Sequence, residues 1–239
     1  MRTIVIADIH GQFQTFKKLM KKIKFNEEQD RLILLGDYID RGEESLEVLE
    51  YVHFLKQHGA VVLGGNHENM FLSWMDYPNE TRRAVHYFQN GGGTTIRSLL
   101  GEIEMDAVPQ KLIEEKYPKL LEMIRGMDNY YETEEAIYVH AGVDPDKKDF
   151  RTTSEEDFRW IREKFWAGGN TTGKHIFFGH TPTGILRRQY GKDMQDFSPF
   201  TLSCGTKTAI DGGAAFGEQL NAVILENEDM SWEAVKVKE

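Results

Sequence analysis

One structural unit occurs three times near the start of this chain of 239 residues: an apolar run, a polar cluster and then a helical pattern. The apolar runs cover residues 3–7, 31–35 and 60–63, and apolar residues at helical spacing follow each of them. Short β-branched runs that alternate with amphipathic segments are typical of βαβ units, whose strands pair in parallel. The repeat therefore predicts an α/β fold built on a parallel sheet.

Polar side chains follow each predicted strand at the point where the strand ends. Right-handed crossovers place such strands side by side, with their carboxyl ends at the edge where open α/β sheets hold ligands. We therefore expect side chains that are far apart in the sequence to meet at this edge. In chain order they are Asp8, His10, Asp37, Asp40, Asn66 and His67.

Four of the eight histidines share one context, after an apolar run and close to a glycine. They are His10, His67, His140 and His180. A single histidine at a strand end is usually a hydrogen-bonded structural residue, but that explanation does not account for four of them beside several aspartates. Carboxylates gathered at one edge repel one another and are costly to bury. A pair of divalent cations at this edge would remove that cost.

The donor types narrow the choice of metal. Imidazole nitrogen with carboxylate and amide oxygen, without thiolate, suits Mn²⁺, Fe or Zn²⁺ better than Ca²⁺ or a structural zinc. Asp8 and His10 are two residues apart, so in an extended strand end both side chains would point the same way and hold one ion. We expect two divalent metal ions, with manganese as the first choice.

The composition of the chain limits the cellular compartment in which it could work and the partners that it could bind. A single cysteine allows no internal disulfide, which fits a reducing compartment. The apolar start is interrupted by Asp8 and His10, and no stretch approaches the ~18 apolar residues of a membrane span. The net charge of −10 argues against general binding to nucleic acid or to anionic membranes. We expect a cytoplasmic monomer that binds neither nucleic acid nor membrane.

The pattern changes between about residues 69 and 130, where prolines and the triplet Gly91–Gly93 punctuate helical stretches. We interpret this region as a helical insertion that covers the site, within a single domain of residues 1–239. The last strand-like runs alternate less regularly than the first ones, which favours a second, mixed sheet. The later strand-like runs are residues 136–139, 175–178, 200–202, 222–225 and 232–237.

Five short motifs occur in order: Asp-x-His-Gly at residues 8–11, Gly-Asp-x-x-Asp-Arg-Gly at 36–42, Gly-Asn-His-Glu at 65–68, His-Ala-Gly at 140–142 and Gly-His-Thr at 179–181. This series resembles the signature of the metallophosphoesterase superfamily, and in particular its phosphoprotein phosphatase branch. Residues 90–93, 160–162 and 210–213 make the chain most similar to the bacterial and phage serine/threonine protein phosphatases. The resemblance implies a calcineurin-like fold, in which two mixed β-sheets pack as a sandwich flanked by helices.

The resemblance also implies a dinuclear metal centre. The first metal ion is held by two residues of the first motif, and the second by an amide and two imidazoles, while one carboxylate bridges both ions. A hydroxide held between the two metals attacks phosphorus in line. The implied ligands are Asp8, His10, Asp37, Asn66, His140 and His180.

The remaining motif residues are implied in substrate binding and proton transfer. Arg41 and Arg162, together with Asn66, bind the phosphoryl oxygens, for which a planar guanidinium is a suitable donor. His67 protonates the leaving alkoxide and Asp40 orients it.

The implied activity is metal-dependent hydrolysis of phosphomonoesters, and we predict a serine/threonine protein phosphatase that acts on phosphorylated proteins or small phosphoesters. The alternative is a symmetrical bis(5′-nucleosyl)-tetraphosphatase, which hydrolyses dinucleoside polyphosphates. Many of those hydrolases have Asp after Asn-His, whereas this chain has Glu68, and the triplet Gly91–Gly93 also favours the protein phosphatase. The alternative from another class is a non-catalytic phosphate-binding protein, but no metal ligand or acid is missing here.

Overall fold

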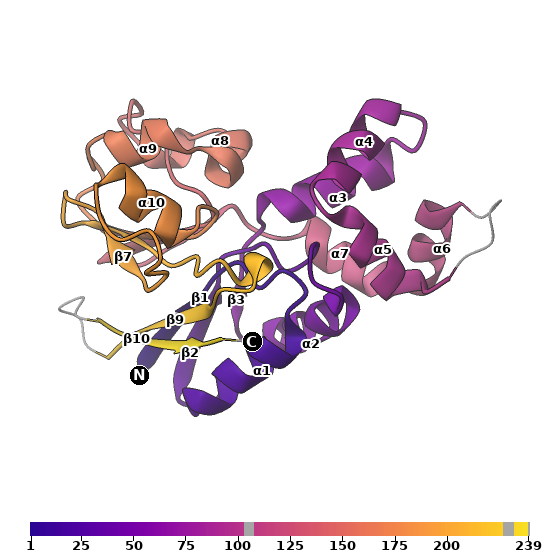
Figure 1. Ribbon diagram of the computed structural model, residues 1–239, viewed down its shortest axis with the longest axis horizontal. Coiled ribbons are helices and arrows are strands. Elements are labelled where there is room, and N and C mark those ends of the chain that lie inside the picture. Colours follow the sequence, from indigo (N-terminus) through magenta and orange to yellow (C-terminus); the bar gives the residue numbers. More distant parts are fainter. Residues whose placement is uncertain (103–107, 227–231, 239) are drawn as a thin grey trace.

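The three apolar runs at the start of the chain form parallel strands of one sheet (Figure 1). This computed structural model describes residues 1–102, 108–226 and 232–238. The three parallel strands are β1 (Arg2–Ile6), β2 (Asp30–Leu34) and β3 (Val61–Val62). They are connected by α1 (Phe13–Lys22) and α2 (Ser45–Gln57). The prediction of an α/β fold that begins with βαβ units is confirmed.

The first sheet continues on the other side of β1 with the last two strands of the chain. β9 (Leu220–Leu225) pairs antiparallel with β1, and β10 (Trp232–Val237) pairs antiparallel with β9. The prediction that these last strands belong to a second sheet was wrong. The alternation of apolar residues reports which faces of a strand are buried, and it does not report which strand is the neighbour. β9 is buried along its whole length, as an inner strand should be.

The second sheet has the order β4-β5-β6-β8-β7. Its inner strands β5, β6 and β8 are parallel, and both edge strands are antiparallel to their neighbours, so the sheet is mixed. The sequence predicted three of these strands and missed β4 and β8, which are only three residues long. The strands are β4 (Tyr130–Glu132), β5 (Ala136–Val139), β6 (His175–Phe178), β7 (Phe200–Thr201) and β8 (Lys207–Ala209).

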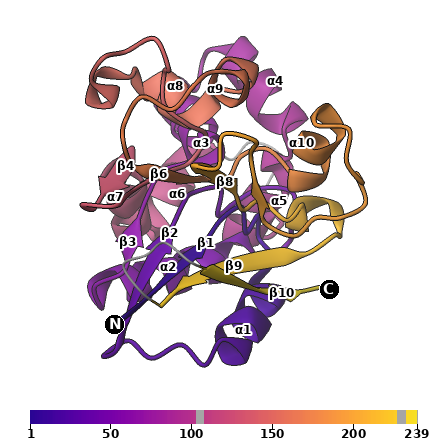
Figure 2. The ribbon, with the colours of Figure 1, turned by 90° about the vertical axis from the view of Figure 1, so that its left-hand side faces the viewer.

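The two sheets pack face to face, as Figure 2 shows from the side. Alternate residues of each strand point to opposite faces. In β1, Val5 joins a cluster shared with Tyr138 and Phe177 of the second sheet. Ile4 and Ile6, on the other face of β1, pack in the cluster that also contains residues of α1 and α2. The molecule is therefore a sandwich of two sheets with helices outside, as the resemblance implied.

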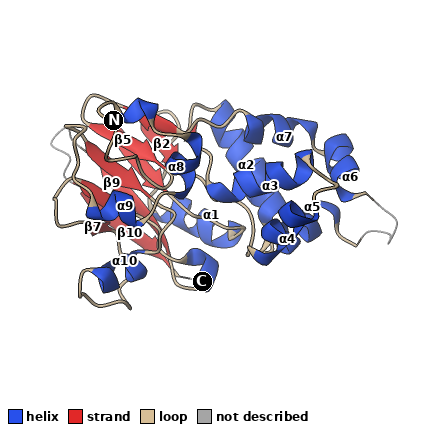
Figure 3. Cartoon of the chain, turned by 90° about the horizontal axis from the view of Figure 1, so that it is seen from above, coloured by secondary structure: helices blue, strands red, loops and turns tan. Residues whose placement is uncertain are grey.

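The chain between β3 and β4 is largely helical, and its helices extend from one side of the strands (Figure 3). Pro109 and Pro118 each begin a helix, where the missing N–H of proline leaves no hydrogen bond unmade. Residues 103–107 of the predicted insertion lie outside the described residues. The helices are α3 (Asn66–Asp76), α4 (Thr81–Gln89), α5 (Gly92–Leu100), α6 (Pro109–Lys116) and α7 (Pro118–Arg125).

Three short helices and two 3₁₀ turns complete the structure. Side chains of α8, α9 and α10 pack in the cluster that covers the outer face of the second sheet. In the part of the chain that the structure describes, no helix is long and apolar enough to cross a lipid bilayer. The helices are α8 (Glu155–Trp160), α9 (Glu163–Ala167) and α10 (Thr183–Gln189), and the 3₁₀ turns are η1 (Phe150–Thr152) and η2 (Ala214–Phe216).

The place of β9 inside the first sheet leads to a stability prediction. Val223→Ala should lower the free energy of unfolding by about 2 kcal/mol, because Val223 is fully buried between the two sheets. Val235→Ala in the edge strand β10 is the control and should cost less than about 1 kcal/mol, because Val235 is only partly buried. Urea unfolding of both variants measures the difference, and equal losses would contradict the inner position of β9.

Candidate metal centre

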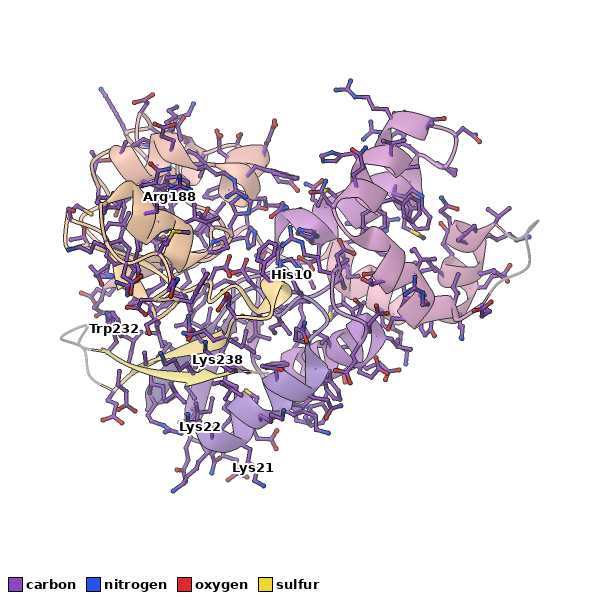
Figure 4. The ribbon with its side chains drawn as sticks, viewed as in Figure 1. His10, Lys21, Lys22, Arg188, Trp232 and Lys238 are labelled. Carbon is purple, nitrogen blue, oxygen red and sulfur yellow. The ribbon has the colours of Figure 1, made fainter. Side chains whose placement is uncertain are left out.

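The carboxyl ends of six parallel strands, three from each sheet, meet in one place. Asp8 and His10 follow β1, residues 37–41 follow β2, and Asn66 and His67 begin α3 directly after β3. From the second sheet, His140 follows β5, His180 follows β6 and Asp211 follows β8. Figure 4 places His10 near the centre of the molecule. The packing of the two sheets therefore brings together residues that lie more than 100 positions apart.

Asp37 stands between two sets of donor atoms. Its Oδ2 lies 3.5 Å from Nε2 of His10, and its Oδ1 lies 3.5 Å from Nε2 of His140. All three side chains are buried. Within each set, the donor atoms lie within 4.8 Å of one another. The sets are His10, Asp37 and His67, and Asp37, His140 and His180.

Asn66 completes the second set. Its Oδ1 lies 2.9 Å from Nε2 of His140 and 2.7 Å from Nδ1 of His180. One amide oxygen, two imidazole nitrogens and one carboxylate oxygen thus point at the same volume. This is a hard to borderline donor set without sulfur, which suits a divalent first-row metal.

Asp8 adds a further buried carboxylate to the centre. Its two carboxylate oxygens accept the backbone N–H of His180, at 2.9 Å and 3.1 Å. Burial raises the pKa of Asp8 well above its usual value, and repulsion from Asp211 and Asp37 raises it further. A cation between Asp8 and Asp37 would relieve that repulsion. The site therefore fits a metal ion better than it fits bare carboxylates.

The protonation of the histidines also fits metal ligands. Nδ1 of His10 donates to the carbonyl of Ile39, and Nδ1 of His140 donates to the carbonyl of Leu35, both at 2.9 Å. The Nε2 lone pair of each ring then faces Asp37, as is usual for metal-bound histidine, and that of His10 also lies within hydrogen-bond distance of Arg41. Burial lowers the pKa of His10, His140 and His180, which keeps these rings neutral. The residues present fit two divalent cations that share Asp37.

His67 differs from the other three histidines of the centre. Its Nδ1 lies 2.7 Å from Oδ2 of Asp40. Burial by itself would lower the pKa of His67. The negative charge of Asp37 and the hydrogen bond to Asp40 outweigh this effect, so the pKa of His67 is raised. His67 lies within reach of His10 and Asp37, but its bond to Asp40 and its tendency to hold a proton distinguish it from the neutral rings.

The helical region between β3 and β4 supports this pair. The other carboxylate oxygen of Asp40 accepts the hydroxyl of Tyr87 on α4 at 2.9 Å and the hydroxyl of Thr95 on α5 at 2.6 Å. All four side chains are buried. Neither Tyr87 nor Thr95 was predicted as a site residue, because nothing in their spacing relates them to residues 40 and 67.

The predicted extended strand end at Asp8 and His10 was wrong. β1 ends at Ile6, and Asp8 and His10 have left-handed backbones with φ of 58° and 49°. Among the described residues, six of the seven non-glycine residues with positive φ belong to this centre. They are Asp8, His10, Asp37, Asp40, Arg41 and His180, with φ between 49° and 72°. Such conformations cost about 1 kcal/mol or more each and are concentrated at functional sites.

The two predicted phosphoryl-binding arginines each contact a different part of the centre. Nη1 of Arg41 donates to Nε2 of His10 at 3.2 Å, and its guanidinium lies 5.1 Å from the ring centroid of Phe216. Arg162 follows α8, and its Nη1 donates to Oγ1 of Thr181 at 3.0 Å, next to His180. A planar guanidinium is thus available on the His10 side and on the His180 side.

Two further buried carboxylates of the centre were not predicted as site residues. Glu68 accepts the backbone N–H groups of Asp37, Tyr38 and Gly65 at 2.8–2.9 Å, so it holds the two loops that carry the metal ligands together. Burial and Asp37 raise its pKa to about 7. Asp211 is buried next to Asp8 and Asp37. The motif at residues 210–213 pointed to it, but β8 was not predicted, so the end of that strand was not considered.

The absence of a side chain at Gly65 and Gly179 makes room for the carboxylates of Asp37 and Asp8. A Cβ at residue 179 would lie 2.1 Å from Oδ2 of Asp8, and a Cβ at residue 65 would lie 2.2 Å from Oδ1 of Asp37. Both distances are far inside van der Waals contact. These positions therefore exclude any side chain while the carboxylates stay in place.

Gly179→Ala should therefore weaken binding of Mn²⁺ by about tenfold or more, because the new methyl group displaces the carboxylate of Asp8. The control is Gly169→Ala, where a Cβ would meet nothing within 4 Å. Calorimetric titration of both metal-stripped variants with Mn²⁺ measures the change, and unaltered affinity in Gly179→Ala would contradict the assignment of Asp8 to the centre.

Comparison with known proteins agrees with this geometry. The family model of the calcineurin-like phosphoesterases matches residues 1–204. The chain is 29% identical over 221 residues to serine/threonine-protein phosphatase 1 of Salmonella typhimurium, covering 90% of this chain and 88% of that protein. It is also 29% identical over 210 residues to the symmetrical bis(5′-nucleosyl)-tetraphosphatase of Xanthomonas oryzae. That match covers 88% of this chain but only 56% of the Xanthomonas protein.

Solved structures share the fold at lower identity. The crystal structure of a proposed diadenosine tetraphosphatase has a TM-score of 0.65 at 16% identity and covers 98% of this chain and 93% of that one. A serine/threonine phosphatase from Saccharomyces cerevisiae has a TM-score of 0.60 at 13% identity and covers 100% of this chain and 80% of that one. With the matched family model and the donor set around Asp37, these findings place the chain in the calcineurin-like phosphoesterase family of metal-dependent hydrolases.

Proposed function

We propose that this protein is a phosphomonoesterase that removes phosphoryl groups from phosphoserine and phosphothreonine in proteins. The observation that carries the proposal is the His67–Asp40 pair, joined at 2.7 Å, beside two donor sets that share Asp37. An acid of this kind is needed where the leaving group is an alkoxide, which departs poorly without a proton.

The two cations would be held by Asp8, His10 and Asp37 on one side and by Asp37, Asn66, His140 and His180 on the other. When bound, they would neutralise the phosphoryl oxygens and activate water for attack. Neutral imidazoles with oxygen donors favour Mn²⁺, and Fe or Zn²⁺ are the alternatives. Arg41, next to His10, and Arg162, next to Thr181, would hold the phosphoryl oxygens together with Asn66.

His67 is the proposed general acid. Asp40 accepts the proton on Nδ1, which leaves Nε2 to deliver a proton to the leaving oxygen. Tyr87 and Thr95 hold the other oxygen of Asp40, so the orientation of His67 depends on α4 and α5 as well as on the strand ends. We call Asp40, Tyr87 and Thr95 positioning residues, because they act through His67.

The choice of phosphoprotein as substrate rests on the extent of the similarity. The chain matches the Salmonella phosphatase over 88% of that protein, whereas it spans little more than half of the Xanthomonas tetraphosphatase. Hydrolysis of dinucleoside tetraphosphates is the second candidate, supported by identities of 29% and 38% to the tetraphosphatases of two Xanthomonas oryzae strains.

A direct comparison of substrates tests the proposal. With Mn²⁺, kcat/KM for a phosphoserine peptide should exceed that for diadenosine tetraphosphate by at least about tenfold. A clear preference for the dinucleotide would replace the proposal with the second candidate. Asp37→Asn, which alters the shared ligand, should abolish turnover of both substrates, and full activity of this variant would contradict the metal-dependent chemistry itself.

Removal of the acid should depend on the leaving group. His67→Ala should slow hydrolysis of a phosphoserine peptide by about 10²–10⁴-fold. The same change should slow hydrolysis of p-nitrophenyl phosphate much less, because nitrophenolate leaves without a proton. Steady-state kcat on both substrates measures the contrast. Equal slowing of both would mean that His67 is a metal ligand or a structural residue.

Loss of one hydrogen bond to Asp40 should give the same contrast between the two substrates, but a smaller one. Tyr87→Phe removes the hydroxyl that donates to Asp40 and should slow phosphoserine hydrolysis by about tenfold, with little effect on p-nitrophenyl phosphate. The matched control is Tyr117→Phe, which removes a hydroxyl of the same helical region that donates to the carbonyl of Leu99. Equal kinetics of the two variants would show that Tyr87 does not act through His67.

A further inference from the structure

We propose that a cavity beside the metal centre binds an acidic side chain of the phosphoprotein, close in sequence to the phosphorylated residue. This inference rests on the proposed function and adds a substrate preference to it. The cavity has a volume of about 410 Å³. It is lined by Asn69, Met70, Ser73, Glu80, Arg82, Arg83, His86 and Trp160.

The cavity adjoins the place where the phosphoryl group would bind. Asn69 lies one helical turn after the metal-site residue Asn66 on α3. On the opposite wall, the ring of Trp160 meets the ring of His180 edge to face, with centroids 6.1 Å apart. Arg162 follows Trp160 by two residues. A peptide whose phosphoserine reaches the metal centre would therefore pass the mouth of this cavity with a neighbouring residue.

The side walls come from helices that lie on opposite sides of the centre, α4 and α8 (Figure 1). His86 on α4 faces Trp160 at the end of α8, with ring centroids 6.0 Å apart. Trp160 is half-buried, so it offers an apolar wall to the methylene groups of a bound side chain.

The free charge inside the cavity is positive. Arg83 is held by Glu80 at 2.6 Å and by Ser73 at 2.6 Å, and its guanidinium stacks on Tyr77. The charges of Arg83 and Glu80 therefore cancel, and both side chains already have partners within the protein. Among the described residues, no carboxylate lies within ion-pair distance of Arg82, which is exposed at the cavity.

The positive charge at this cavity contrasts with the net charge of −10 of the whole chain. The chain as a whole repels acidic peptides, so a local cation next to the phosphoryl site selects for them through a short-range contact. A carboxylate on Arg82 would form a charge-assisted hydrogen bond, with Asn69 and Ser73 as further polar contacts. The geometry thus points to aspartate or glutamate near the phosphoserine.

Phosphoserine peptides with one aspartate placed at each flanking position in turn test this inference, against the same peptide with alanine throughout. In the wild-type enzyme with Mn²⁺, at least one position should raise kcat/KM by about five- to tenfold. Arg82→Ala should abolish this gain. Arg82→Glu should reverse it, so that lysine at the same position becomes the favoured residue, which a merely structural role of Arg82 would not produce.

Two controls separate this site from other effects. Arg188→Ala removes an exposed arginine of α10 that lines a different cavity and is labelled in Figure 4, and this variant should keep the preference for aspartate. Turnover of p-nitrophenyl phosphate, which has no flanking residue, should be unchanged in all three variants.

If the enzyme is active on phosphopeptides but aspartate at no flanking position raises kcat/KM, the inference is overturned and the proposed function stands. The inference would also be overturned if the Arg82 variants changed only the turnover of diadenosine tetraphosphate, because the cavity would then bind a nucleotide. If the wild-type enzyme hydrolysed p-nitrophenyl phosphate but no phosphopeptide, the proposed function would fail first, and this inference with it.

Discussion

Repulsion among buried carboxylates is the constraint on which the rest of this centre depends. Asp8, Asp37, Asp40 and Asp211 are all buried where the two sheets meet, and the histidines between them are mostly neutral. Backbone N–H groups offset part of the charge, as at Asp8 and Asp37. Two divalent cations would offset the rest of this repulsion, so metal binding should also stabilise this edge of the fold.

The backbone is bent to make this arrangement possible. Asp8, His10, Asp37, Asp40, Arg41 and His180 all adopt left-handed conformations, which stable packing elsewhere must offset. The cost is tolerated because the strands behind these turns are deeply buried, with side chains such as Val5, Ile33 and Phe177 between the sheets. Rigid strands followed by tight turns hold ligand atoms at fixed positions, which a flexible loop would not do.

The region between β3 and β4 contributes to the centre as well as covering part of the molecule. Tyr87 and Thr95 reach Asp40, and Glu68 at the start of α3 fixes the loop of Asp37. A Cβ at residue 64 would lie 3.1 Å from the guanidinium of Arg159, so α8 places a guanidinium close to Gly64 and to the start of α3.

The sequence by itself determined the βαβ repeat, the strand ends that carry Asp8, Asp37 and Asn66, and the histidines that join them, because local periodicity and residue type are properties of short segments. Tertiary structure alone decided that β9 and β10 enter the first sheet, that Asp211 reaches the centre after a three-residue strand, and that Tyr87 supports Asp40. These are contacts between segments far apart in the chain, and no local pattern encodes which segment a strand or a hydroxyl will meet.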